Sequence, residues 1–223
     1  PLVLVVEDER DLSELSVIPG IPLSYWVPTE LRELYSSSVV LDADNGRVDR
    51  DSHGRAKVGL QTGDDNRFIS RFWEVSGNDD WKPFSKGGSD AWLLPRVTRT
   101  LLWGNNGSEV KRFGGSYPRN EDWYFSEALT YTMSKRSGRR FGYLHEESIF
   151  GHMGSVYIPD NHIWTALSYT NSHLFTYLML SQTSERNWYV GLVSRLPWLD
   201  AIESSEELEA LSKSAVGHLL SKR

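Results

Sequence analysis

The chain has 223 residues and a formal net charge of −6, with 24 Lys and Arg against 30 Asp and Glu. It contains no cysteine, which excludes disulfides, thiolate metal sites and a cysteine nucleophile. The absence of cysteine fits a cytoplasmic origin best. The longest apolar stretches are far too short to span a bilayer and no signal peptide is visible, so we expect no membrane contact.

The positive charge is concentrated in the middle of the chain. Residues 51–199 hold 17 Lys and Arg against 15 Asp and Glu, whereas the two flanking segments together hold 7 against 15. Within 81–140 the balance is 11 against 5. The acidic total argues against indiscriminate nucleic-acid binding, but it hides a locally basic centre.

The first part of the chain combines short apolar runs with polar segments. The run at 2–6 predicts a buried strand, and a first residue that is Pro1 rather than Met indicates a cut through a longer protein. A short helix is predicted from Thr29 onward, with Thr29 as its N-cap. The polar, turn-rich stretch at 41–55 predicts a mobile loop.

From 56 to 160 the pattern is that of short strands separated by turns. The runs AKVGLQTG and RFISRFWEV flank GDDN, a typical turn sequence. WGNNGSEV predicts a hairpin turn, because Gly and Asn accept a positive φ. A further hairpin is predicted over 130–144, and its tip carries Lys135, Arg136, Arg139 and Arg140.

Helices are expected mainly towards the end of the chain. Residues 163–182 predict one long helix whose apolar stripe is interrupted by Asn171. Residues 187–199 predict a final strand, and SSEE at 204–207 predicts a capping box that opens a C-terminal amphipathic helix. Together these elements predict an α+β fold, largely antiparallel and strand-rich, with packing helices.

No catalytic motif stands out. The sequence lacks a glycine-rich phosphate loop and a His-Glu-x-x-His motif, and its histidines lie on different predicted elements, so we expect no metal site. Glu109 and Lys111, with Asp90 upstream, match a pattern of some metal-dependent nucleases. Alternating charges on a solvated strand are the simpler interpretation of these residues.

Basic side chains in predicted turns are the more informative signal. Arginine and lysine on loops are suited to phosphate contacts and to reading guanine in the major groove. The interleaved aromatic residues are expected in the core, because alternate positions of a strand face inward. Composition alone favours a solvated surface whose charges keep the protein soluble.

A series of segments carries a family resemblance over about 19–199. The first is PLSYWVPTELRELY, and it is followed by GLQTGDDNRFISRFWEV, WKPFSKGG, LLWGNNGSEVK, RNEDWYFSEALTYTMSKRSG, SIFGHMGSVYIP, ALSYTNSHLFTYLM and YVGLVSRLPW. In this order they resemble the C-terminal specificity region of large TaqI-like adenine-specific DNA methyltransferases. This group includes type IIG restriction-modification enzymes and the PglX methyltransferases of BREX phage defence.

The resemblance implies a DNA-binding target recognition domain, similar to the specificity-subunit domains of type I restriction systems. Such a domain reads double-stranded DNA and presents an adenine to a methyltransferase domain. The implied organisation is a connecting segment at 1–18, the target recognition domain at 19–199 and a C-terminal helix at 200–223. The polar TNSHLF segment is implied to serve packing and hydrogen bonding.

The family's catalytic chemistry is missing from this sequence. The Asn-Pro-Pro motif and the glycine-rich S-adenosylmethionine motif are absent, and methylation requires the pocket that holds the flipped adenine. We therefore expect that the chain alone is not an enzyme and holds no cofactor. S-adenosylmethionine is implied for the parent protein, in a prokaryotic cytoplasm.

The resemblance also selects residues expected to contact DNA. The stronger candidates are Lys86, Lys111, Arg112, Arg119, Lys135, Arg136, Arg139 and Arg140, and the weaker ones are Ser85, Ser116, Asn120 and Ser137. For Arg67 and Arg71, pairing with Asp64, Asp65 or Glu74 is favoured over DNA contact.

A second hypothesis concerns protein partners. The acidic flanks are suited to docking on the methyltransferase domain of the same parent chain. Other defence proteins or a phage inhibitor that mimics DNA are further expected partners of such an interaction module.

Overall fold

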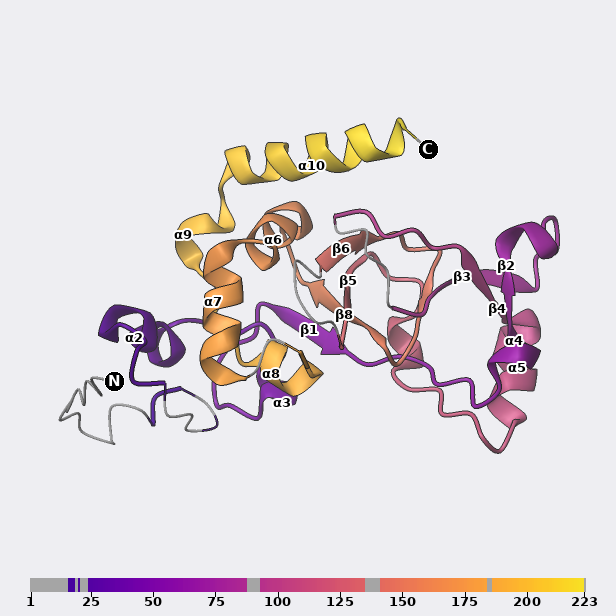
Figure 1. Ribbon diagram of the computed structural model, residues 1–223, viewed down its shortest axis with the longest axis horizontal. Helices are drawn as coiled ribbons and strands as arrows, with labels where there is room; N and C mark the ends of the chain where they lie inside the picture. The colour runs from indigo at the N-terminus through magenta and orange to yellow at the C-terminus, as the bar shows by residue number, and fades with distance from the viewer. Residues whose placement is uncertain are drawn as a thin grey trace, which may run out of the picture.

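The computed structural model describes residues 16–18, 20, 24–87, 93–134, 141–183 and 186–222. Predictions on other residues, including the strand at 2–6, lie outside this description. The described chain has an α+β fold, as the sequence predicted, with two four-stranded sheets. Most helices gather around one sheet, and the other sheet lies towards the opposite end of the molecule (Figure 1).

The first sheet is antiparallel throughout. In spatial order its strands are β1 (Gly54–Lys57), β8 (Gly154–Pro159), β5 (Ala128–Thr132) and β6 (Phe141–Leu144). Every residue of β5 is buried, because neighbouring elements cover both faces of the sheet there.

The predicted hairpin over 130–144 is formed by β5 and β6. The two strands pair antiparallel, with Tyr131 opposite Phe141. The pairing of the strands is therefore confirmed, whereas residues 135–140, which make up the basic tip, lie outside the described residues.

The second sheet has mixed direction. In spatial order its strands are β2 (Ile69–Arg71), β4 (Arg99–Leu102), β3 (Trp81–Ser85) and β7 (Ile149–Phe150). β4 pairs antiparallel with β2 and β3, and β7 pairs parallel with β3. The sheets meet where the Ser85 and Thr130 hydroxyls lie 3.0 Å apart in a buried hydrogen bond.

Helices flank the sheets and complete the chain. Those near the first sheet are α2 (Thr29–Ser37), α3 (Ala43–Gly46), α6 (Ile163–Thr170), α7 (His173–Gln182) and α8 (Val190–Ser194). Those near the second are α4 (Asp65–Phe68), α5 (Gly104–Arg112) and the short turns η1 (Phe72–Glu74) and η2 (Glu121–Trp123). The chain continues through α9 (Asp200–Glu203) to α10 (Glu206–Leu220), which packs on α6 (Figure 1).

Aromatic residues build two hydrophobic cores, one for each sheet. In the first, Phe141 stacks on Tyr131 with ring centroids 4.8 Å apart and meets Phe175 edge-on at 5.3 Å. In the second, Tyr124 contacts Phe150 at 5.2 Å, beside the buried Phe68. Burying such large rings is a main source of folding free energy, and their packing holds the strands and helices of each core in place.

The predicted long helix at 163–182 is two helices. The break lies at Asn171, whose side-chain amide donates to the carbonyls of Leu167 at 2.9 Å and Phe141 at 3.1 Å. Ser172 then caps α7 by accepting the Phe175 N–H at 3.0 Å. The polar segment therefore serves packing and hydrogen bonding, as the resemblance implied.

The predicted hairpin turn in WGNNGSEV is wrong. Asn105, Asn106 and Gly107 do have positive φ values of 49°, 53° and 69°, but they form a left-handed turn within the first part of α5. A Cβ atom on Gly107 would lie 2.5 Å from the Trp103 ring. Asn and Gly suit both kinds of turn, so the local pattern does not distinguish them.

The predicted final strand at 187–199 is largely wrong as well. Residues 190–194 form α8. The segment before it pairs with residues 133–134, and the segment after it is extended as well. That segment pairs with residues 39–41 through bonds from Leu41 N to Leu196 O at 3.0 Å and from Trp198 N to Val39 O at 2.7 Å. A short apolar run fits a buried helix as well as a strand.

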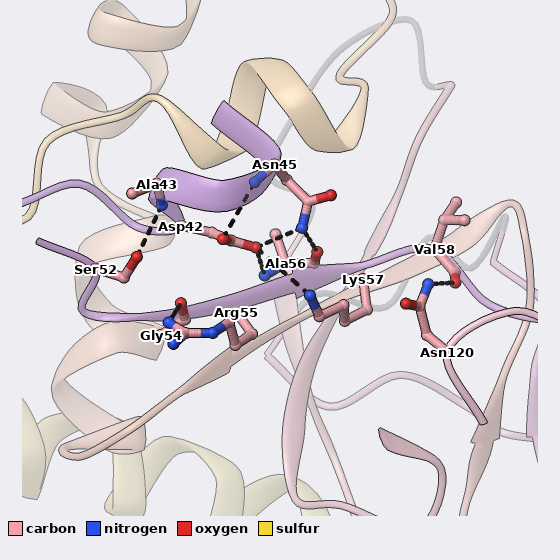
Figure 2. A network of polar contacts seen from close by, with 10 residues as sticks. All are labelled: Asp42, Ala43, Asn45, Ser52, Gly54, Arg55, Ala56, Lys57, Val58 and Asn120. Atoms are coloured by element: carbon pink, nitrogen blue, oxygen red, sulfur yellow. Dashed lines mark hydrogen bonds and ion pairs between the residues drawn. The ribbon is translucent and has the colours of Figure 1, made fainter. Parts of the chain in front are cut away.

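The polar stretch at 41–55 is a packed part of the fold rather than the predicted mobile loop. Its centre is Asp42, which is fully buried and caps α3. The Asp42 carboxylate accepts hydrogen bonds from the Asn45 amide at 2.6 Å and from the Ala56 N–H at 2.8 Å (Figure 2). Lys57 lies 4.0 Å from the same carboxylate.

Two predicted helix caps differ by one residue. Thr29 is the first residue of α2, and Pro28 is its N-cap. The N-cap of α10 is Ser205, which accepts the Leu208 N–H at 3.3 Å, one residue later than predicted. Within the described ranges, the helices are too short or too polar to cross a membrane.

Candidate nucleic-acid interface

A cleft lies where the two sheets meet. Its volume is about 320 Å³, and its walls come from the end of β2, the end of β3, the approach to β4 and the strand β5. The residues that line it are Arg71, Phe84, Ser85, Lys86, Gly87, Pro95, Arg96, Val97, Thr98, Arg99, Thr130, Tyr131 and Thr132.

The lining is cationic and rich in hydroxyl groups. Arg71, Lys86, Arg96 and Arg99 contribute four positive charges, and none of the described lining residues is acidic. Serine and threonine side chains supply hydroxyl donors along the same walls. Guanidinium and ammonium groups beside hydroxyls are the chemistry that binds phosphate oxygens.

Two of the arginines stand at opposite positions on neighbouring strands. Arg71 of β2 and Arg99 of β4 are direct register partners. Like charges in directly opposite positions destabilise a strand pair. In the described part of the chain, Arg96 and Arg99 form no ion pair, and Arg71 donates to the Thr98 hydroxyl at 3.2 Å. An anion in the cleft would relieve this repulsion.

Lys86 stands between this cleft and a second cavity. The second cavity, of about 380 Å³, is also lined by Asp65 and His152. The Lys86 ammonium contacts the Asp65 carboxylate, which accepts a 2.6 Å hydrogen bond from Thr62. Burial and the charge of Arg99 lower the pKa of Lys86. An anion bound near Lys86, in addition to the Asp65 carboxylate, would offset the repulsion between the charges of Lys86 and Arg99.

The predicted DNA-contact residues lie in several places. Ser85 and Lys86 line the cleft, although the Ser85 hydroxyl is largely taken by Thr130. On α5, Lys111 contacts Glu121, and Arg112 donates to the Ser108 carbonyl at 3.0 Å. Lys111 is therefore held by a carboxylate, and Arg112 by a backbone carbonyl.

The loop after α5 holds three more candidates. Ser116 donates to the Gln61 carbonyl at 3.2 Å, and Asn120 donates to the Val58 carbonyl at 2.8 Å (Figure 2). Both side chains fix the loop against the segment after β1. Arg119 is exposed. Whether these residues contact DNA stays a prediction.

The basic tip of the β5–β6 hairpin is not placed. Lys135, Arg136, Ser137, Arg139 and Arg140 lie outside the described residues. The strand that leads into the tip does line the cleft, because Thr130 and Thr132 belong to its wall. The tip therefore follows directly from a cleft-lining strand in the sequence.

Arg67 and Arg71 differ from the expected pairing. The Arg67 guanidinium lies 3.7 Å from Glu109, and its backbone N–H, not its side chain, is bonded to Asp64 at 3.2 Å. For Arg71 it is again the backbone N–H that donates to Glu74, at 2.8 Å. The Arg71 side chain lines the cleft and donates to the Thr98 hydroxyl, which differs from the ion pairing expected for it.

The nuclease pattern does not assemble around Glu109 and Lys111. Both lie on α5 rather than on a strand, and residues two apart on a helix point to different sides. Each has its own ion-pair partner, and Asp90 lies outside the described residues. In the described ranges, no three acidic or histidine side chains gather where they could hold a metal ion.

Arg96 and Arg99 were missed by the sequence reasoning. The sequence criterion for a candidate is a position in a predicted turn, whereas Arg96 lies just before β4 and Arg99 is its first residue. The signal was the spacing in PRVTR, which repeats an arginine every third residue after a proline. Only the pairing of β4 with β2 brings Arg99 opposite Arg71.

The fold and this cleft define an α+β domain with a cationic groove between two sheets. No family model matches the chain. The chain is similar to the adenine-specific methyltransferase BrxX of Escherichia coli O9:H4 (strain HS), with 26% identity over 218 residues. The match covers 92% of this chain but 17% of that protein. The chain thus spans about a sixth of the length of the curated relative it matches.

Proposed function

We propose that this chain is a double-stranded DNA recognition module of an adenine-specific DNA methyltransferase that acts in BREX-type phage defence or restriction-modification. In this proposal the remaining parent chain supplies the catalytic pocket and S-adenosylmethionine. The module supplies sequence reading and places the target adenine.

The observation that carries the proposal is the cationic cleft. Four cations converge at the junction of two sheets in a chain whose net charge is −6. Two like charges at directly opposite positions are expected to cost stability in the free protein. Such a cost is expected where a polyanion is the natural occupant, because the phosphates neutralise the repulsion.

The similarity to BrxX gives the cleft its context. The match extends over nearly the whole chain and a small part of the relative, as expected for a module within a larger methyltransferase. Phosphate contacts in the cleft would set the register of the duplex. Side chains from the neighbouring basic loops would then read base edges in the major groove.

The proposal is tested by removing two cations from the cleft. We expect the Arg96→Ala/Arg99→Ala variant to bind a random duplex more weakly than the wild-type chain. The slope of log K against log salt should also become less steep by about 0.9 for each phosphate that the variant no longer neutralises. Fluorescence anisotropy over a salt series measures both quantities.

A matched control removes the same charge elsewhere. Lys213 and Lys222 lie at exposed positions on and just after α10 and are not among the cleft residues. Lys213→Ala/Lys222→Ala should leave the salt slope unchanged. Equal slopes for the wild type and the cleft variant, or an equally weakened affinity in both variants, would contradict a DNA-binding role for the cleft.

A further inference from the structure

Two adjacent aromatic side chains stand exposed beside the cleft. Phe72 and Trp73 belong to the turn η1, which directly follows the cleft residue Arg71 at the end of β2. Their exposed fractions are 53% and 58%, and their rings meet edge-on with centroids 5.0 Å apart. Two large exposed rings side by side form an apolar patch, and its position beside the cleft is what suggests a binding role.

Hydrogen bonds tie the turn η1 to neighbouring residues. Glu74 accepts the Arg71 N–H at 2.8 Å, and the Phe72 N–H bonds to the Thr98 carbonyl at 3.3 Å. These contacts tie η1 to the segment that leads into β4, which also lines the cleft. The aromatic pair is therefore joined to the cleft wall by backbone hydrogen bonds.

A cation links the rings to the cleft. The Arg71 guanidinium carbon lies 5.6 Å from the centre of the Trp73 ring, within range of a cation–π contact. The same side chain donates to the Thr98 hydroxyl in the cleft wall. A phosphate bound by Arg71 would thus lie next to an aromatic ring, which is the arrangement that binds a phosphate and its neighbouring base in single strands.

We propose that Phe72 and Trp73 form a stacking site for a DNA base that has left the duplex stack, next to a backbone phosphate held in the cleft. This inference rests on the proposed function and deepens it. Opening of one base step beside the contacted phosphates would expose the base. The rings would stabilise that base without reading its identity, because every base has a stacking face.

The test compares three short duplexes of the same sequence. One is intact, one carries a single unpaired adenine, and one carries an abasic site at the same position. The abasic duplex retains the flexible backbone but lacks the stacking face. For the full 223-residue chain, we expect the unpaired adenine to bind roughly 5- to 150-fold more tightly than the abasic site. A 2-aminopurine at that position should lose fluorescence on binding.

The variants assign this preference to the rings. Phe72→Ala/Trp73→Ala should bind the two lesion-containing duplexes equally while retaining its affinity for the intact duplex to within a few-fold. Trp73→Phe should retain part of the preference, because a ring remains. Both rings are exposed, so their truncation leaves the two cores intact.

A matched aromatic pair serves as the control. Tyr25 and Trp26 are each 56% exposed and also meet edge-on, at 5.5 Å, but they lie just before α2 and not among the cleft residues. Tyr25→Ala/Trp26→Ala should behave like the wild type. An equal loss of the preference in this control, or an undiminished preference in the Phe72/Trp73 variant, overturns the stacking site.

The two proposals fail in different ways. If the wild type binds the intact duplex through the cleft but shows no preference for the unpaired adenine, the stacking site alone is wrong. If the wild type binds none of the three duplexes at low salt, the DNA-recognition function is wrong and the stacking site falls with it.

Discussion

Asp42 shows how one buried side chain organises a polar part of the chain. Its carboxylate joins the cap of α3 to the backbone of β1 through Asn45 and Ala56 (Figure 2). Asn45 also donates to the Ala56 carbonyl at 2.8 Å, and Ser52 accepts the Ala43 N–H at 2.8 Å. This network is the reason that a stretch with the composition of a loop is ordered.

Replacing this carboxylate should be strongly destabilising. We expect Asp42→Ala to lower the free energy of unfolding by about 3 kcal/mol, because buried donors of Asn45 and Ala56 lose their acceptor. Urea unfolding measures the change. Asp44→Ala is the control, since Asp44 is exposed in the same short helix. A similar decrease in both variants would contradict the role of the network.

His53 makes stability dependent on pH. Its ring stacks on Trp198 at 3.6 Å, and its Nδ1 lies 2.6 Å from the Tyr157 hydroxyl. Burial, together with the charge of His162, lowers the pKa of His53 from 6.5 to about 4. Below about pH 6.5 the His53 side chain takes up a proton in the unfolded chain but stays neutral in the folded chain. The contribution of His53 to the free energy of unfolding is therefore fully present above that pH and is lost as the pH decreases towards 4.

The His53 contribution is measured as a difference between two proteins. Each pH unit between the two pKa values is expected to cost the folded state about 1.4 kcal/mol. Urea unfolding of wild type and His53→Gln at several pH values between 4 and 7 separates this effect from that of the carboxylates. If both proteins lose stability in parallel as the pH falls, His53 is not responsible.

At the scale of elements, the β5–β6 hairpin connects the cleft to the basic tip. Four cations lie in the connection between Thr132, which lines the cleft, and the first residue of β6. A tip that contacts phosphates would extend the cationic surface of the cleft along the duplex.

Removing part of this tip tests its role. We expect Arg139→Ala/Arg140→Ala to weaken duplex binding and to flatten the salt dependence, by about 0.9 in slope for each phosphate that is no longer neutralised. A residue that reads a base should instead cost roughly 1–3 kcal/mol at its own base pair and relax specificity there. Unchanged affinity of this variant at low salt would remove the tip from the interface.

Some elements can be predicted from local sequence patterns alone, and others cannot. Strands β5, β6 and β8 follow from apolar and β-branched runs, and the sequence predicts them well. The left-handed turn of α5 and the helix α8 were mistaken for a hairpin turn and a strand, because Asn-Gly runs and five-residue apolar runs each fit two structures. Tertiary packing selects between them.

At the scale of the whole molecule, negative and positive charges lie in different parts of the chain. The net charge of −6 arises from the acidic flanks, whereas the cleft between the sheets carries four cations. Acidic flanks together with a cationic groove would disfavour random binding and direct a polyanion to that groove. The sum of the charges does not reveal this surface, but the arrangement of β2, β3, β4 and β5 does.

The sequence by itself determined the α+β class, the strand-rich middle, the aromatic cores and the basic central region. These features depend on composition and on patterns within a few residues of each other. The tertiary structure decided which cations converge. Arg71 and Arg99 are 28 positions apart, and they meet because β2 and β4 pair in one register. The burial of Asp42 and the exposure of Phe72 and Trp73 were decided in the same way, because burial depends on the packing of distant segments.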